Sequence, residues 1–225
     1  MRYEVHNRKN IDRLTDDNLL VELLTMRGVG NAYELLNLNP SVLKDGWKFR
    51  NMEEAIELLD LHLLHNDHIH IIMDSDVDGL TSASAMYGYI TRASDCVVTY
   101  DTHTKKQHGL YREIVERIPT DTKLVIIPDA GSDTKSEEWI KMLVNSGYNV
   151  LVLDHHEIEG LKDCEGIYRN ENVGVIVNNQ DGYYENDTLS GVGVVFKFLQ
   201  VMDSAIPRDN VEAMDFLGLV SLGLN

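Results

Sequence analysis

Three aspartates follow an apolar stretch near residue 70 at every second position. They are Asp74, Asp76 and Asp78, and Gly79 and a helix-like pattern come directly after them. On an extended backbone, side chains two residues apart lie on the same face. Three carboxylates in one small volume repel one another, and a divalent cation between them removes that repulsion. The spacing therefore predicts a metal site directly after a strand.

The same spacing also occurs in calcium-binding helix-loop-helix motifs and in solvated acidic turns. The calcium motif begins with D-x-D-x-D-G, but its loop needs a bidentate glutamate at the twelfth position and a helix in front. Counted from Asp74, the twelfth position is Ala85, and residues 68–73 in front have the pattern of a strand. Whether the aspartates form only a solvated acidic turn depends on the rest of the chain.

Length and composition indicate a soluble globular protein. The chain has 225 residues, of which 43% are hydrophobic and 25% charged, which suits one sizeable domain or two small ones. No apolar run is long enough to span a membrane, and the N-terminus contains no apolar signal region. Cys96 and Cys164 form no CxxC pair and indicate neither a disulfide framework nor a zinc cluster. We therefore expect a cytoplasmic protein that binds no membrane.

The formal net charge of −17 argues against a generic nucleic-acid-binding surface. Phosphate backbones are bound mainly by lysine and arginine, which are the minority here. A bound cation reverses the local sign, however, so an acidic chain can still handle phosphates through a metal site. Composition alone does not exclude DNA as a partner.

The elements that position the aspartates alternate between strands and helices. Residues 1–66 read as a helical N-terminal segment packed on the core, and residues 67–225 as the domain that carries the chemistry. Uniformly apolar runs are typical of strands buried on both faces, and their alternation with helices predicts parallel crossovers. We expect an α/β fold, with a parallel, largely buried sheet and helices on both faces. The expected strands are 68–73, 96–100, 124–127, 150–153 and 173–177, and the expected helices are 80–92, 110–117, 136–146, 189–199 and 211–222.

Residue types that bind metals follow each of the first four expected strands. In a parallel sheet of this kind the carboxyl ends meet at one edge, where the site lies. A solvated acidic turn after one strand would not explain why metal-binding residue types follow all four strands. They are Asp74, Asp76 and Asp78 after the first strand, Asp101 and His103 after the second, Asp129 after the third, and Asp154, His155 and His156 after the fourth.

Oxygen ligands with one or two imidazoles suit manganese or magnesium, whereas a structural zinc site uses thiolates. Four or more carboxylates and a histidine exceed what one ion binds, so we expect two ions. Such a pair, roughly 3.5–4 Å apart, lowers the pKa of a bound water and holds the oxygens of an in-line displacement at phosphorus. The residue types therefore predict phosphoester hydrolysis.

Three motifs occur in order, each after an expected strand: DxDxDG at 74–79, DAG at 129–131 and DHH at 154–156. Together they resemble the first three motifs of the DHH phosphoesterase family. LSGVGVVFKF at 189–198, with Asn178 and Asn179 before it, further resembles the RecJ branch of single-strand-specific 5′ to 3′ DNA exonucleases. The similarity covers nearly the whole chain.

The resemblance implies a role for each metal-binding residue. Asp74 and Asp76 would hold one ion. Asp78 and His155 would hold the other, and Asp129 would bridge the two.

For the chemical step, the resemblance implies that His156 lies beside the scissile phosphate. There it would stabilise the developing charge or protonate the leaving oxygen. A helix-capping or structural histidine is the alternative. Asp154 would orient an imidazole, as metal-bound histidines usually require.

Two regions are candidates for substrate binding. RecJ relatives place an arginine for the 5′ phosphate in the loop that here spans 102–108, where His103 or Lys105 would substitute unless the loop is simply solvated. Ser190, Gly191 and Gly193 open a helix whose N-terminal N–H groups could bind an anion, although tight helix packing explains the glycines equally well.

RecJ-like chains continue into a further aspartate that completes the second metal, and then into a C-terminal domain that helps to grip single-stranded DNA. This chain ends at Asn225. By resemblance we expect a truncated catalytic core in which the second ion binds weakly.

Three functional hypotheses follow. The leading one is a manganese- or magnesium-dependent enzyme of a bacterium or a phage-infected cell that hydrolyses single-stranded DNA from the 5′ end and releases 5′ mononucleotides. The second is a small-substrate DHH enzyme acting on short oligonucleotides, cyclic dinucleotides or pyrophosphate. The third is a non-catalytic replication scaffold, against which the intact Asp and His residues of every motif argue.

Overall fold

The computed structural model describes residues 16–37, 43–103, 109–158 and 166–224. The chain divides into two compact units, 1–44 and 45–225, which are described separately. In the first unit, α1 (Asp16–Met26) and α2 (Ala32–Leu36) are joined by a turn in which Gly28 has a φ of +87°. Only glycine adopts that conformation without strain, which explains the break between the two helices.

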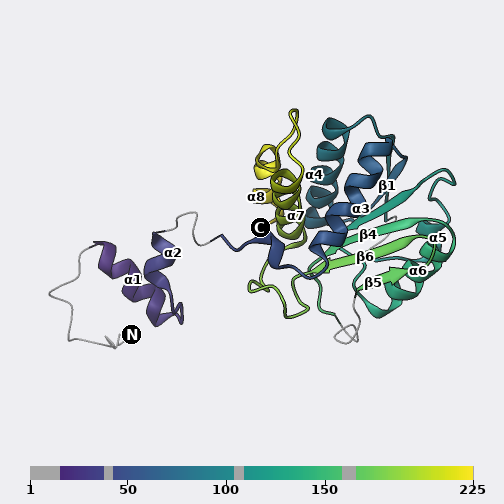
Figure 1. Cartoon of the computed structure of the whole chain (residues 1–225). Helices are drawn as coiled ribbons and strands as arrows, with labels where there is room; N and C mark the ends of the chain where they lie inside the picture. Colours follow the sequence, from purple (N-terminus) through teal and green to yellow (C-terminus); the bar gives the residue numbers. More distant parts are fainter. Residues whose placement is uncertain (1–15, 38–42, 104–108, 159–165, 225) are drawn as a thin grey trace. The chain divides into compact units, whose positions relative to one another are not determined.

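The second unit is built on a six-stranded sheet with the order β2-β1-β3-β4-β6-β5 (Figure 1). The five expected strands are confirmed and are parallel: β1 (Ile69–Met73), β2 (Val98–Thr102), β3 (Leu124–Pro128), β4 (Asn149–Asp154) and β6 (Val173–Asn178). An antiparallel edge strand, β5 (Ile167–Arg169), was not expected, because three residues carry no readable periodicity. The strand order reverses between β1 and β3, and ligands of such folds bind at that reversal.

Helices cover both faces of the sheet, as expected (Figure 1). One face packs against α3 (Met52–His65), α4 (Val77–Ala93) and α7 (Gly191–Ala205) through buried strand residues such as Ile71, Ile126 and Leu151. The opposite face packs against α5 (Arg112–Val115) and α6 (Thr134–Asn145) through the residues in between, such as Val125 and Val152. Because side chains alternate along a strand, the central strands contribute to both cores.

The helix α3, which we expected in the N-terminal segment 1–66, belongs to the second unit. Its residues Met52, Leu59 and Leu63 are buried in the core that α7 and the sheet also form. The boundary therefore falls after Lys44 and not after residue 66. The apolar face of α3 explains the difference, since it needs the sheet to remove it from water.

The expected helix 211–222 is two elements, a 3-10 turn η4 (Ala213–Phe216) and α8 (Leu217–Gly223). The Glu212 and Asp215 side chains form a reciprocal capping box on η4, which starts the turn there. A further 3-10 turn, η3 (Gly46–Lys48), precedes α3. Within the described residues, every helix is too short or too polar to cross a bilayer.

Candidate metal centre

The carboxyl edge of the sheet brings together side chains from three separate strand ends. Asp129, His155 and His156 each offer a ligand atom within 4.8 Å of the others. His155 Nε2 lies 3.2 Å from Asp129 Oδ1 and 3.6 Å from Asp78 Oδ2. Three of the five expected metal ligands, Asp78, Asp129 and His155, thus meet at one point.

The ring of His155 is held so that one nitrogen faces the carboxylates. Its Nδ1 lies 3.1 Å from the carbonyl oxygen of Leu189, which can only accept a hydrogen bond. In the neutral ring Nδ1 therefore carries the hydrogen, and Nε2 presents a lone pair toward Asp78 and Asp129. The Asp129 carboxylate, 3.2 Å from Nε2, favours a positive charge there and accordingly raises the pKa of His155. A metal ion would supply the same charge.

Asp129 is almost completely buried, at 1% exposure, and has a left-handed backbone with a φ of +64°. Burial raises its pKa to about 7, and the nearby charges of Asp78 and Asp154 act in the same direction. Although His155 is close, Asp129 Oδ1 has no hydrogen bond of acceptable geometry within the described part of the chain. A buried carboxylate oxygen in this state fits a cation.

Gly191 allows α7 to approach this carboxylate. A Cβ at position 191 would lie 2.6 Å from Cβ and Cγ of Asp129 and closer still to its Oδ1. A Cβ at Gly193 would meet Leu189 at 3.4 Å, an ordinary contact. Of the two glycines, only Gly191 is therefore required by the packing of the centre.

Asp154 organises the second imidazole. Its Oδ1 accepts hydrogen bonds from the backbone N–H groups of His155 and His156 and from His156 Nδ1, at 2.7, 3.2 and 2.8 Å. The hydrogen bond that His156 donates to Asp154 raises the pKa of His156 to about 9. Burial favours the neutral acid of Asp154, but its hydrogen bonds with His156 and Ser132 hold its pKa below the ordinary value. His156 is therefore a cation at neutral pH, and its side chain is half exposed.

Asn178 and Ser132 support this arrangement, and we had assigned them no role. Asn178 Nδ2 donates to Ser132 Oγ at 2.9 Å and to the His156 carbonyl at 3.1 Å, while the Ser132 N–H donates to Asp154 at 2.9 Å. Asn178 is the last residue of β6. The search for metal-binding residue types after each strand would have found Asn178 if it had included side-chain amides.

Asp74, Asp76 and Asp78 all lie outside the cluster of mutually close ligand atoms found among the described residues, and of the three Asp78 lies 3.6 Å from His155 Nε2. Asp74 is buried and accepts the Ser75 N–H at 2.6 Å, whereas Asp76 is exposed and caps α4 by accepting the Gly79 N–H at 2.9 Å. The charge of Asp74 nevertheless contributes to the raised pKa of His156, so it acts on the same region.

The expected substrate contacts of the loop after β2 differ from what the structure contains. His103 is buried, with Nε2 2.9 Å from the Gly109 carbonyl and Nδ1 3.3 Å from Asp74 Oδ1. Both ring nitrogens are thus engaged, and His103 contacts Asp74, while its role in substrate binding stays a prediction. Lys105 lies outside the described residues. Asp101 lies within β2 and pairs with Arg117 at 3.3 Å, away from the centre.

The helix N-terminus that we expected to bind a substrate anion already holds a carboxylate. The N–H groups of Gly191 and Val192 each donate to Asp78 at 2.8 Å, and Ser190 Oγ accepts the Gly193 N–H at 3.3 Å. A carboxylate is stabilised at a helix N-terminus by these donors and by the helix dipole. Gly191 and Val192 therefore fix Asp78, whereas Ser190 caps the same helix by accepting the Gly193 N–H.

Comparison with known proteins places this arrangement in context. A family model described as "DHH family, N-terminal domain" matches residues 68–224. The chain is 34% identical over 206 residues to a protein of Bacillus subtilis (strain 168) named provisionally as the SPbeta prophage-derived single-strand DNA-specific exonuclease YorK. This match covers 91% of the chain and 33% of the relative, so the chain spans about a third of that protein.

Two RecJ proteins are also similar. The single-stranded-DNA-specific exonuclease RecJ of Bacillus subtilis (strain 168) is 27% identical over 224 residues, covering 93% of this chain and 27% of that protein. The crystal structure of RecJ with Mn²⁺ from Thermus thermophilus superposes with a TM-score of 0.66 at 20% identity, over 92% of this chain and 28% of that one. At that identity the likeness shows the fold.

Proposed function

This chain belongs to the DHH family, and on that premise we propose that it is a two-metal phosphodiesterase that hydrolyses single-stranded DNA from the 5′ end and releases 5′ mononucleotides. The relatives named as single-strand DNA-specific exonucleases support the substrate. We propose residues 68–224 as the part of the chain that carries the chemistry.

One observation carries the proposal: His155 Nε2 faces the carboxylates of Asp78 and Asp129, and Asp129 Oδ1 is a buried oxygen without a hydrogen bond within the described residues. We propose that Asp78, Asp129 and His155 hold one divalent ion, with Asp74 and Asp76 completing the site of a second. Bound ions of this kind activate water and neutralise charge on a phosphate. Manganese is the first ion to test, since the similar RecJ structure contains it.

The surrounding residues fix the reacting groups in advance. The α7 amides hold Asp78, and the Leu189 carbonyl sets the ring of His155. Asp154 keeps His156 cationic and half exposed, so His156 can neutralise phosphate charge and give its Nε2 proton to the leaving oxygen. Asp154 is the positioning residue for that step.

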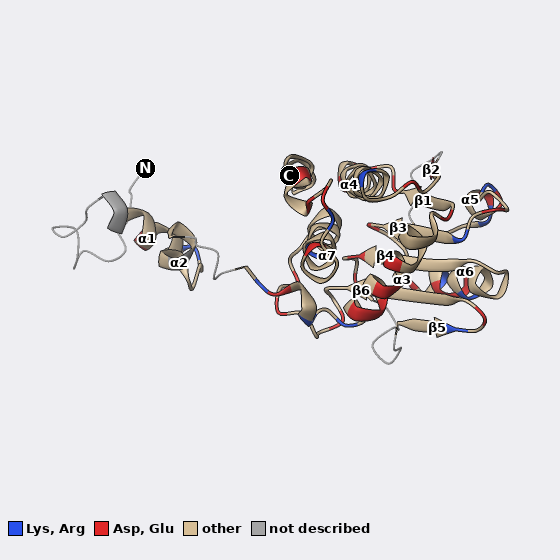
Figure 2. Ribbon diagram, turned by 45° about the horizontal axis from the view of Figure 1, so that its top comes forward, with Lys and Arg blue, Asp and Glu red and all other residues tan. Residues whose placement is uncertain are grey.

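The distribution of surface charge is consistent with DNA binding at the proposed metal centre and not over the general surface. Acidic residues run along α3, and lysines and arginines are scattered (Figure 2). With a net charge of −17, a long polyanion gains little from the general surface. We therefore expect affinity for DNA to depend on the metal ions and on contacts close to them.

The test is cleavage in manganese of an oligonucleotide labelled at either end, as a single strand and as a duplex, beside a dinucleotide. We expect the 5′ label to leave first, as a mononucleotide, from the single strand alone. Cleavage of the dinucleotide alone would refute the DNA substrate and favour small nucleotides. Asp129→Asn should abolish cleavage, and Asp209→Asn, an exposed residue elsewhere, is the matched control.

A further inference from the structure

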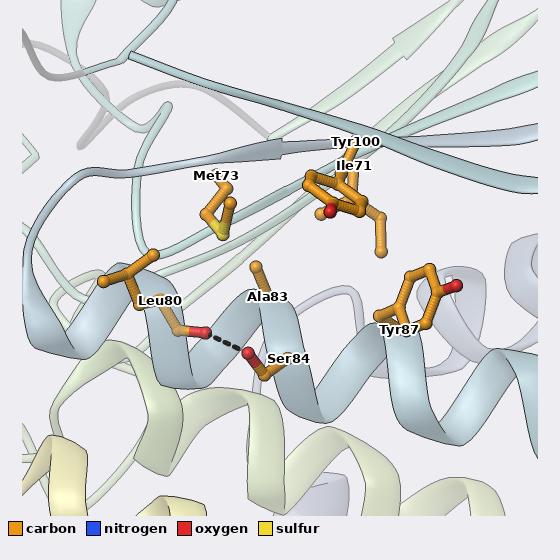
Figure 3. Close-up of a pocket in the computed structure, with 7 residues that line it drawn as sticks. All are labelled: Ile71, Met73, Leu80, Ala83, Ser84, Tyr87 and Tyr100. Atoms are coloured by element: carbon orange, nitrogen blue, oxygen red, sulfur yellow. Dashed lines mark hydrogen bonds between the residues drawn. The ribbon is translucent and has the colours of Figure 1, made fainter. Parts of the chain in front are cut away.

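An apolar groove of about 420 Å³ lies between α4 and the edge strand β2 (Figure 3). Its walls are aliphatic, thioether and aromatic side chains. The groove exists because β2 is the last strand on its side of the sheet and α4 packs over β1 and β3, which leaves the face of β2 partly uncovered. The main lining residues are Ile71, Met73, Leu80, Ala83, Tyr87 and Tyr100.

One end of the groove is built by the same turn that carries the aspartates. Met73 directly precedes Asp74, and the Leu80 N–H donates to the Asp76 carbonyl at 3.0 Å in the first turn of α4. Tyr87 follows seven residues later, which is roughly 10 Å along a helix. The groove therefore begins beside the proposed metal centre and leads away from it.

Among the described residues that line the groove, none is charged, and the Ser84 hydroxyl already donates to the Leu80 carbonyl at 2.6 Å. Tyr87 and Tyr100 are 40% and 61% exposed, with ring centroids 6.0 Å apart and the rings perpendicular. Next to so many carboxylates a phosphate is disfavoured in such a groove, whereas a flat, uncharged base is not. Exposed aromatic rings stack with any base.

We propose that this groove binds a nucleobase of single-stranded DNA, adjacent to the phosphate at the metal centre, by stacking on the ring of Tyr87, with the perpendicular ring of Tyr100 against the edge of the base. The inference rests on the proposed function. Because stacking uses the face that every base presents, the contact is tolerant of sequence. Because these lining residues are uncharged, the contact does not depend on salt.

The experiment is run in manganese throughout. It measures the anisotropy of a fluorescent oligothymidylate whose phosphorothioate linkages resist cleavage, and KM for cleavage of the ordinary oligonucleotide. Tyr87→Ala should weaken binding roughly five- to 150-fold, the range given by the loss of one base–aromatic stack. Tyr100→Ala, which removes the edge contact, should weaken it by less. Tyr87→Phe keeps the ring and should bind like the wild type. Met142→Ala, equally exposed at 40% but on α6 across the sheet, is the matched control.

An abasic residue in the oligonucleotide separates this groove from other contacts. Placed at the position that stacks, it should weaken wild-type binding as much as Tyr87→Ala does, and it should cause no further loss in that variant. Unchanged affinity and KM in both alanine variants would overturn the inference and leave the edge of β2 as a protein-binding surface. Wild-type binding that depends on the rings, without cleavage of any DNA, would instead refute only the proposed activity.

Discussion

Replacing Gly191 by alanine tests whether close packing of α7 positions Asp129. The added Cβ would lie 2.6 Å from Cβ and Cγ of Asp129, where 3.4 Å is an ordinary contact, so the carboxylate must move by about 1 Å. A misplacement of that size costs on the order of 100-fold in rate. Overpacking typically costs about 1–3 kcal/mol of stability.

Gly193→Ala is the matched control in the same helical turn. Its Cβ makes only ordinary contacts, and alanine is favoured over glycine in a helix by up to about 1 kcal/mol. Both variants gain that helix propensity, so only the overpacking at position 191 distinguishes them. We expect their free energies of unfolding to differ by about 1–3 kcal/mol, and each kcal/mol corresponds to roughly 2–4 °C in Tm. Urea unfolding measures the stability, and calorimetric titration with manganese measures the metal site.

The expected result is a loss of manganese affinity and of about 100-fold in cleavage rate for Gly191→Ala, with neither loss for Gly193→Ala. Equal activity of the two variants would show that Asp129 does not depend on the approach of α7. Equal loss would point to a general disturbance of the helix N-terminus and would also refute the reasoning.

Three other predictions can be checked independently. Asn178→Ala removes three hydrogen bonds: those that Asn178 donates to Ser132 and to the His156 carbonyl, and the one that it accepts from the Gln180 N–H. It should cost about 1–3 kcal/mol in urea unfolding and lower kcat more than it raises KM; unchanged kcat would contradict its positioning role. Asp154→Asn should lower the pKa of His156, observed by NMR, because the hydrogen bond with the Asp154 carboxylate is what raises it to about 9; an unshifted His156 would refute that cause. Burial lowers the pKa of His70 from an ordinary 6.5 to about 4. Between pH 6.5 and about pH 4, His70 is therefore protonated in the unfolded chain but neutral in the folded one. The free energy of unfolding should therefore fall by about 2 kcal/mol between pH 7 and pH 5. In urea unfolding, His70→Gln should remove this part of the pH dependence. An identical pH dependence in both proteins would contradict the prediction.

The fold could be predicted from the sequence where the pattern is long and local. The strands around Ile71, Ile126 and Leu151 are uniformly apolar because both faces are covered, and this pattern with intervening helices permits few topologies. The strand β5 could not be predicted, since its pairing with β6 depends on tertiary contact.

The candidate site could be predicted as far as topology determines it. Parallel strands bring Asp129, Asp154 and His155 to one edge whatever the details of packing. The partner of Asp78 could not be predicted, because the amides of Gly191 and Val192 lie more than a hundred residues away and no local pattern links them. Nor could the burial of His103, which follows from its contact with the Gly109 carbonyl.

The bond between Asp78 and the amides of α7 affects how the protein is made. Translation delivers the DxDxDG segment early, but the donors that fix Asp78 are synthesised only with residues 191 and 192. A nascent polypeptide stalled with β6 outside the ribosome and α7 still in the exit tunnel could form its parallel strands and would still lack the donors that fix Asp78. Manganese titration of ribosome-stalled chains can measure the difference. If the proposed function holds, newly made copies would become active only after α7 has left the exit tunnel and packed on the sheet.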